Sequence, residues 1–235
     1  MLMKRTLFAL ATLGGLTPVA HAVTVSANIV GYAGASGTLD SSDLAGLVPA
    51  SNWNQIEHTG NDISVSNLVD STGAPTALSV SWVSIGPWYM DIGTSNDQRL
   101  FNGYLDNFDE PRTITFSGFE AGTTYQIYLY IDGDNGTHTR HGEYTLGGVT
   151  TTVVDAPGNF SGSYEVVAAG TTGEGNATVF TVSGATSYDL VFHGDLADDL
   201  PRAPLNAFQI VSVPEPSGGV LALLSFAGFL HRRRK

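Results

Sequence analysis

The stretch Tyr125-Gln126-Ile127-Tyr128-Leu129-Tyr130-Ile131 decides the fold class. Apart from Gln126, every side chain in it is aromatic or branched and apolar. Such a run favours a β-strand and is typical of a strand that is covered on both faces. We therefore predict a central strand here. Its aromatic side chains form one nucleus of the predicted core, and Trp82 with Trp88 forms the other.

Short segments of similar character recur on both sides of this strand, at spacings of about 8–15 residues. The segment 78–85 alternates Leu78, Val80 and Trp82 with serines, and 113–116 alternates likewise. The other predicted strands, each bounded by residues that favour turns, are 143–147, 149–154, 163–168, 177–182, 187–192 and 206–212.

Helical patterns are nearly absent between residues 23 and 212. No segment there keeps a 3.6-residue apolar period over three turns. One short helical turn is expected within 40–47, capped by Ser41 or Ser42. Short strands with glycine-rich turns and no longer helix predict an all-β fold, an antiparallel β-sandwich formed by residues 23–212.

The segment 86–111 is too long for an ordinary hairpin loop and mixes aromatic with amide and carboxylate side chains. Aromatic faces can stack on sugar rings while carboxylates and amides bind hydroxyl groups. This pattern indicates a glycan-binding site at Trp88, Tyr89, Tyr104 and Asp106. The alternative is that the same aromatic side chains pack in the core.

Charge is distributed very unevenly along the chain. Residues 23–213 hold 21 of the 22 acidic residues, no lysine and four arginines, Arg99, Arg112, Arg140 and Arg202, for a formal net charge of −17. Such a surface repels phosphate backbones, so we predict no nucleic-acid partner. The chain has no cysteine, which excludes thiol catalysis and cysteine-ligated zinc.

The first 22 residues have the three parts of a secretory signal peptide. Lys4 and Arg5 precede an apolar run over 6–16, and Ala20 and Ala22 occupy the −3 and −1 positions of a cleavage site. We expect a signal-peptide helix over 1–22, export across the inner membrane by the secretion machinery, and a mature chain that begins at Val23.

The last 23 residues, 213–235, differ from the body in composition. Pro214 and Pro216 end the sandwich because proline cannot donate to a sheet. A single uncharged apolar helix is expected over 218–230, followed by the basic cluster 231–235. The positive-inside rule places both basic ends of the chain in the cytoplasm and the acidic body outside.

This tail resembles the PEP-CTERM sorting signal. The matching parts are the apolar segment 218–230 and the flanking residues Val213, Pro214, Glu215, Pro216, Ser217, Arg232, Arg233, Arg234 and Lys235. The resemblance implies an exosortase, a membrane protease, as a partner that recognises the Pro-Glu-Pro region and removes the anchor. It also implies delivery to the cell surface or extracellular matrix of a Gram-negative, polysaccharide-making bacterium.

The apolar segment is short for a permanent anchor. Its 13 residues span about 20 Å as a helix, against a hydrocarbon core of about 30 Å. A transient anchor that awaits cleavage therefore fits better than stable insertion. The alternative, a GPI signal, fits poorly because such tails end in apolar residues and not in basic ones.

Two motifs in the body indicate metal ligands. Asp132, Asp134 and Asn135 follow the central strand on a glycine-bearing turn and offer hard oxygen ligands for a structural Ca²⁺ ion; the alternative is an ordinary hairpin turn. His138 and His141 lie three residues apart, but no third ligand is evident. No other cofactor is expected.

Motifs for catalysis are weak. The carboxylate pairs Asp109-Glu110 and Asp198-Asp199 are of a kind expected by chance in so acidic a chain, and no nucleophile elbow or phosphate-binding loop is present. We therefore predict no enzyme.

The body also resembles exported sandwich domains that accompany this tail. The matching parts are the strand at 125–130, the Asp/Gly loop after it, the strand 142–146 and the closing segment 202–210. The resemblance implies a galactose-binding-like jelly roll. We predict a matrix or cell-surface protein that binds glycans or mediates adhesion, with extracellular polysaccharide as partner. The alternatives are a carbohydrate-active enzyme of the glycoside hydrolase type, with two carboxylates about 5–10 Å apart in one concave site, and a purely structural matrix component.

Overall fold

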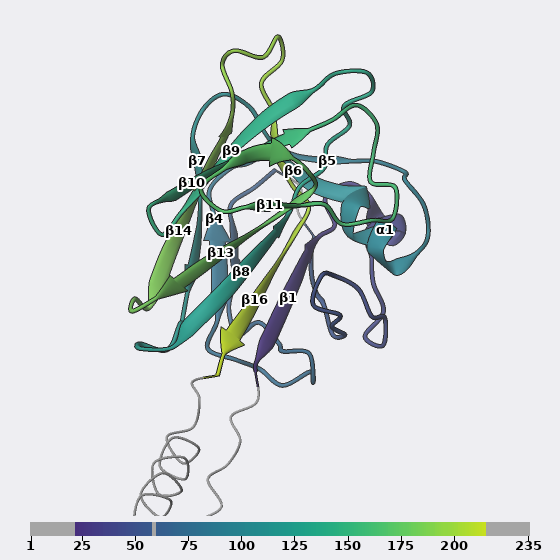
Figure 1. The fold of residues 1–235 in the computed structure, drawn as a ribbon. Coiled ribbons are helices and arrows are strands. Elements are labelled where there is room, and N and C mark those ends of the chain that lie inside the picture. The colour runs from purple at the N-terminus through teal and green to yellow at the C-terminus, as the bar shows by residue number, and fades with distance from the viewer. Residues whose placement is uncertain (1–21, 58–59, 215–235) are drawn as a thin grey trace, which may run out of the picture. The chain divides into compact units, whose positions relative to one another are not determined.

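Two facing β-sheets form most of the chain that the computed structural model describes, residues 22–57 and 60–214 (Figure 1). In spatial order the first sheet contains β11 (Val166–Ala168), β13 (Ala177–Ser183), β8 (Thr124–Tyr130), β16 (Ala207–Val213), β1 (Thr24–Ile29) and β2 (Asn54–Ile56). The second contains β12 (Thr172–Glu174), β10 (Val149–Asp155), β9 (Arg140–Leu146), β14 (Ser187–Gly194), β7 (Arg112–Ser117), β4 (Ser79–Trp82) and β3 (Ile63–Val65).

The strands pair mainly antiparallel, as predicted. In the first sheet β8 pairs with β13 on one side and with β16 on the other. Short strands at the sheet edges depart from this rule, because β2, β11 and β12 each pair parallel with their neighbour.

The main core lies between the two sheets. Alternate side chains of β8 point into it, as do those of β4, β7 and β14 from the opposite sheet. Phe116 of β7 and Phe208 of β16 meet across the sandwich with ring centroids 4.9 Å apart. Full burial of each such side chain contributes about 1.5–3 kcal/mol to folding, so this interface is the main source of stability and confirms the predicted sandwich.

The predicted strands all appear, with shifted ends, but two expectations about the core are wrong. In β8 only the end near Tyr130 is covered on both faces; Gln126 and Tyr128 are half-buried. Trp82 is buried, as expected, whereas Trp88 is 45% exposed and lies outside the core. Residues 40–47 form hydrogen-bonded turns instead of a helical turn.

The segment 86–111 folds into elements of its own, which the sequence patterns did not predict. It contains β5 (Pro87–Tyr89), α1 (Asn96–Asn102) and β6 (Gly103–Asn107), and β6 pairs with both β5 and β15 (Ala203–Leu205) in a third, small sheet. The short 3-10 helix η1 (Gly34–Gly37) contacts α1. Ser95 and Gln98 form a capping box at the start of α1.

Helix α1 packs on the outer face of the first sheet and forms a second apolar cluster there. Phe101 of α1 stacks on Phe160 with centroids 4.1 Å apart and meets Tyr130 edge to face at 6.1 Å. This cluster covers the end of β8 that carries Tyr130. Helix α1 is therefore held against the first sheet at this end of β8.

Several predictions fall outside the described residues. The signal-peptide helix, Ala20, Glu215, Pro216, Ser217, the apolar segment 218–230 and the basic cluster all lie there. Among the helices that are described, none has the length and apolar character needed to span a bilayer. Val213, the first residue of the predicted tail, is still part of β16 and pairs with Thr124.

Candidate functional site

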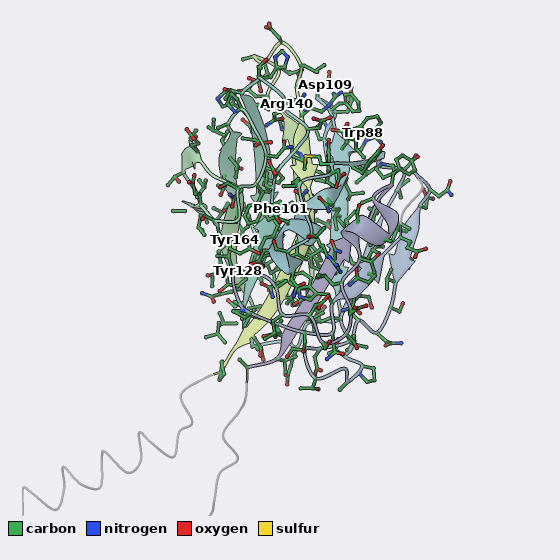
Figure 2. All side chains as sticks on the ribbon, turned by 90° about the vertical axis from the view of Figure 1, so that its right-hand side faces the viewer. Trp88, Phe101, Asp109, Tyr128, Arg140 and Tyr164 are labelled. Carbon is green, nitrogen blue, oxygen red and sulfur yellow. The ribbon has the colours of Figure 1, made fainter. Side chains whose placement is uncertain are left out.

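A pocket of about 400 Å³ lies where the small sheet meets the loops that follow β8 and precede β15. Its walls combine aromatic rings with two acidic and two basic side chains. They are formed by Gly86, Pro87, Trp88, Tyr104, Asp106, Phe108, Asp134, Arg140 and Arg202. Figure 2 shows Trp88 and Arg140 at the end of the sandwich opposite to the start of β1 and the end of β16, strands that Figure 1 labels.

The small sheet fixes the aromatic wall of the pocket. Trp88 of β5 pairs in register with Tyr104 of β6, and Asp106 pairs with Pro204 of β15. Gly31 supports β5 from behind: it has a φ of +55°, and a Cβ atom there would lie 2.7 Å from the carbonyl oxygen of Trp88. The close approach of these backbones therefore requires glycine.

Arg202 joins two other walls of the pocket. Its Nε lies 3.1 Å from Oδ1 of Asp106, and its guanidinium carbon lies 3.5 Å above the centre of the Phe108 ring. Burial raises the pKa of Asp106 above its ordinary value, and the Arg202 charge opposes that rise. Phe108 is 48% exposed, and the cation–π contact fixes the orientation of Arg202 over it.

Tyr104 connects the small sheet to the loop after β8. Its ring is buried, and its hydroxyl oxygen accepts a hydrogen bond of 3.1 Å from the backbone N–H of Asp134. Burial raises the pKa of the Tyr104 hydroxyl well above its ordinary range, so it stays protonated. It can therefore still donate its own proton to a ligand.

Arg140 is the fourth charged group of the pocket. It is the first residue of β9 and is only 7% exposed, and its Nε has no hydrogen-bond partner. No acidic side chain among the described residues lies within ion-pair distance of it. Its partner in the strand register is Asp155, whose Oδ2 instead accepts the N–H of Gly133 at 2.9 Å.

The structure brings together three of the four residues predicted from the sequence to bind a glycan, namely Trp88, Tyr104 and Asp106. Tyr89, the fourth, is 49% exposed but does not line the pocket. The prediction missed Phe108, Arg140 and Arg202, and it named Asp134 as a Ca²⁺ ligand and not as part of this site. The body has only four arginines, and two of them line this pocket. Their scarcity in so acidic a chain is the signal in the sequence that could have marked them as functional.

The three predicted Ca²⁺ ligands do not share one cavity. Asp132 and Asn135 are buried, with Asp132 lining a second pocket, whereas Asp134 is exposed and lines the first. Within residues 22–57 and 60–214, no group of three or more histidine, aspartate or glutamate side chains is arranged to hold a metal. The Ca²⁺ ion stays a prediction.

Asp132 instead faces Asp155, a partner that the sequence patterns did not indicate. Oδ2 of Asp132 accepts the N–H of Phe160 at 2.7 Å, and the two carboxyl groups interact directly. Burial raises the pKa of both, and the negative charge of Asp132 raises that of Asp155 further. Two buried carboxyls in contact share a proton more readily than they both ionise.

The remaining motifs have structural roles or lie on the surface. His141 binds Asp198 through Nδ1 at 2.8 Å, and His138 is exposed, so the two histidines do not form a joint site. Asp109 and Glu110 are exposed neighbours in the loop between β6 and β7.

Comparisons with known proteins assign no family to this chain. No protein-family model and no curated protein matches it. Solved structures to which the chain is similar include the plant receptor-like kinase ANX1 (10% identity, TM-score 0.42, 82% of this chain and 49% of that one) and the ANXUR2 extracellular domain from Arabidopsis thaliana (10%, 0.44, 83% and 49%). An exo-beta-1,3-galactanase from Phanerochaete chrysosporium, solved with galactose, gives 11% identity and a TM-score of 0.29 over 60% of this chain and 35% of that one. The chain thus spans about half or less of the length of these proteins.

Proposed function

We propose that this chain is an exported, non-catalytic saccharide-binding protein whose sandwich is a galactose-binding-like jelly roll. An exosortase processes its tail, and the mature protein acts at the cell surface or in the extracellular matrix, where polysaccharide is its partner. The pocket at the small sheet is its binding site. Export and processing rest on the two terminal segments, and binding rests on the pocket.

The binding proposal rests on the exposed indole ring of Trp88. Trp88 lines the pocket and is 45% exposed, so its indole is accessible to a ligand there. Its indole face suits the C–H face of a sugar ring, and the polar groups around it suit hydroxyls. Asp106 accepts, Arg140 donates and Tyr104 can do both. This mixture matches a polyhydroxylated ligand better than an apolar one.

The position of the pocket supports the same proposal. β1 begins and β16 ends at neighbouring positions of the first sheet, with Thr24 opposite Val211. Trp88 and Arg140, which line the pocket, lie at the other end of the sandwich (Figure 2). A body held through residue 213 therefore presents the pocket away from its attachment.

The test is saccharide binding by the wild-type protein and by Trp88→Ala. A glycan array selects the saccharide, and calorimetry gives its affinity. Loss of a stacking indole is expected to weaken binding at least about tenfold. Tyr89→Ala is the matched control, because Tyr89 lies on the same strand with similar exposure but outside the pocket wall.

Two results would contradict the proposal. If Trp88→Ala binds as tightly as wild type, the pocket is not the site. If the wild-type protein binds no saccharide on the array, with or without Ca²⁺, the purely structural role becomes the better account.

A second candidate function is hydrolysis of a glycosidic bond. It is favoured by one observation: Asp106, with its raised pKa, and Asp134 line the same pocket. A glycosidase needs such a pair, one member of which is protonated. The ion pair with Arg202 argues against it, because that contact favours the ionised form of Asp106. Release of reducing sugar that Asp106→Asn abolishes would establish hydrolysis and replace the binding proposal.

A further inference from the structure

We infer that the ligand of this pocket is an acidic saccharide, and that the carboxylate of a uronic acid residue pairs with Arg140. The inference rests on the proposed saccharide-binding function and adds the charge class of the ligand to it. It rests on two observations. The buried Arg140 guanidinium has no ion-pair partner among the described residues, and the pocket walls are neutral on a strongly acidic protein.

Arg140 is a buried cation without an ion-pair partner. Its side chain lines the pocket, its Nε lacks a hydrogen bond, and no described carboxylate lies within 4.0 Å of its nitrogens. Buried charges in proteins are normally paired, because an unpaired one loses its hydration without compensation. A ligand anion would supply the missing partner.

Asp106 and Asp155 interact with the charge of Arg140 only beyond ion-pair distance, and the acidic side chains around it are engaged elsewhere or exposed. Asp106 pairs with Arg202 at 3.1 Å. Asp155 binds the backbone of Gly133 and contacts Asp132. Asp134 is exposed. The protein therefore has no ready substitute for a ligand carboxylate at Arg140.

The pocket is also less negative than the rest of the body, which favours an anion here over elsewhere. Two of the four arginines of a body with formal charge −17 line this one pocket, and with Asp106 and Asp134 they make its walls neutral. Elsewhere the acidic surface repels an anionic polymer. A guanidinium binds a carboxylate through two parallel hydrogen bonds, which gives direction as well as strength.

A singly charged carboxylate fits better than a phosphate. A doubly charged phosphate would meet Asp106 and Asp134 on the same walls, with Arg202 already paired to Asp106. A uronate carries one charge, and its hydroxyls and ring face suit Asp106, Tyr104 and Trp88. Arg140 is thus assigned to the charged group and Trp88 to the ring.

The experiment compares oligogalacturonate with its methyl ester, which has the same backbone without the charge. Calorimetry at low salt, where screening is weak, is expected to show that the acid binds about tenfold or more tightly than the ester. The Arg140→Gln variant should bind acid and ester equally. The Arg112→Gln variant, which removes an exposed arginine outside the pocket, should keep the preference of the wild type.

The outcomes separate this inference from the function on which it rests. Equal binding of acid and ester by wild type, or a preference that persists in Arg140→Gln, would overturn the uronate assignment and leave saccharide binding intact. Stronger competition by inorganic phosphate than by galacturonate would overturn it too. Failure of both oligomers and of every neutral saccharide would refute the proposed function itself. The wild-type comparison needs no variant, so it decides the charge class of the ligand even if Arg140→Gln does not fold.

Discussion

Buried polar atoms without hydrogen-bond partners point to the pocket at the scale of single residues. Among the described residues they are Oδ1 of Asn28 and Asn135 and Nε of Arg140, while Oδ1 of Asp106 lacks a hydrogen bond but forms the ion pair with Arg202. Of these atoms without any partner, Nε of Arg140 belongs to a side chain that lines the pocket. A buried donor without a partner is costly in a folded protein, and a charged, hydroxylated ligand would supply one.

The Asp132–Asp155 pair makes stability depend on pH. The folded-state pKa of each carboxyl is raised by burial. The folded protein therefore binds protons more tightly than the unfolded chain, and the stabilising contribution is fully present below the unfolded aspartate pKa. It is lost as the pH rises through the raised folded-state values.

The Asp155→Asn variant tests this account. It removes one of the two buried charges while its amide oxygen can still accept the Gly133 N–H. We expect it to melt a few degrees above wild type near pH 8 and close to wild type near pH 5, by thermal unfolding followed with circular dichroism. Asp199→Asn, at an exposed position, serves as the control. A variant that melts lower than wild type at pH 8 would contradict the account.

Patterns in the sequence predicted single residues well where one strand determines the environment and poorly where distant segments meet. Trp82 in an alternating strand was correctly expected in the core. Arg140 and Arg202 line one pocket although 62 positions separate them in the chain. Asp132 and Asp155 meet across 23 positions. No local sequence pattern predicts such contacts between distant residues.

At the scale of elements, strands with strong alternation were predictable, and the insertion 86–111 was not. Helix α1 has only 7 residues, too few to show a sustained helical period. Its capping box, Ser95 with Gln98 three residues later, is the signal that would have found it. β5 and β15 have 3 residues each and gain stability by pairing with β6.

Gly31 determines how closely the small sheet approaches β1, and Gly31→Ala tests its role. Both the positive φ and the 2.7 Å approach to the Trp88 carbonyl oppose a side chain there. Gly122→Ala is the matched control, because Gly122 also has a positive φ, +86°, but no atom within 4 Å of its Cβ position.

Both variants should lose about 1 kcal/mol from backbone strain. Gly31→Ala should lose at least about 1 kcal/mol more from the contact, as measured by urea unfolding, and should also bind saccharide more weakly. Equal losses for the two variants would show that the close packing behind Trp88 contributes nothing.

At the scale of the whole molecule, the distribution of charge along the chain bears on both the predicted export and the proposed ligand. The body has a formal charge of −17, and six of the ten basic residues lie in the terminal segments. Removal of both segments would leave an acidic domain whose neutral patch is the pocket. Such a domain repels other copies of itself while it still accepts one anionic group at Arg140.

Mass spectrometry of the protein recovered from its own cells tests the processing. We expect an N-terminus at Val23 and the loss of the basic cluster 231–235, with the new C-terminus near residues 213–217. A protein recovered with its last four residues intact would contradict cleavage by an exosortase.

Tryptophan fluorescence tests the central claim, saccharide binding at Trp88, most directly. The chain has three tryptophans; Trp53 and Trp82 are 5% and 3% exposed, so Trp88 at 45% is the one that a ligand can cover. Titration with oligogalacturonate should shift the emission of the wild type to shorter wavelength, and the Trp88→Phe variant should lose that shift while calorimetry still detects binding. A shift that persists in Trp88→Phe, or binding by wild type with no change in its emission, would contradict the account.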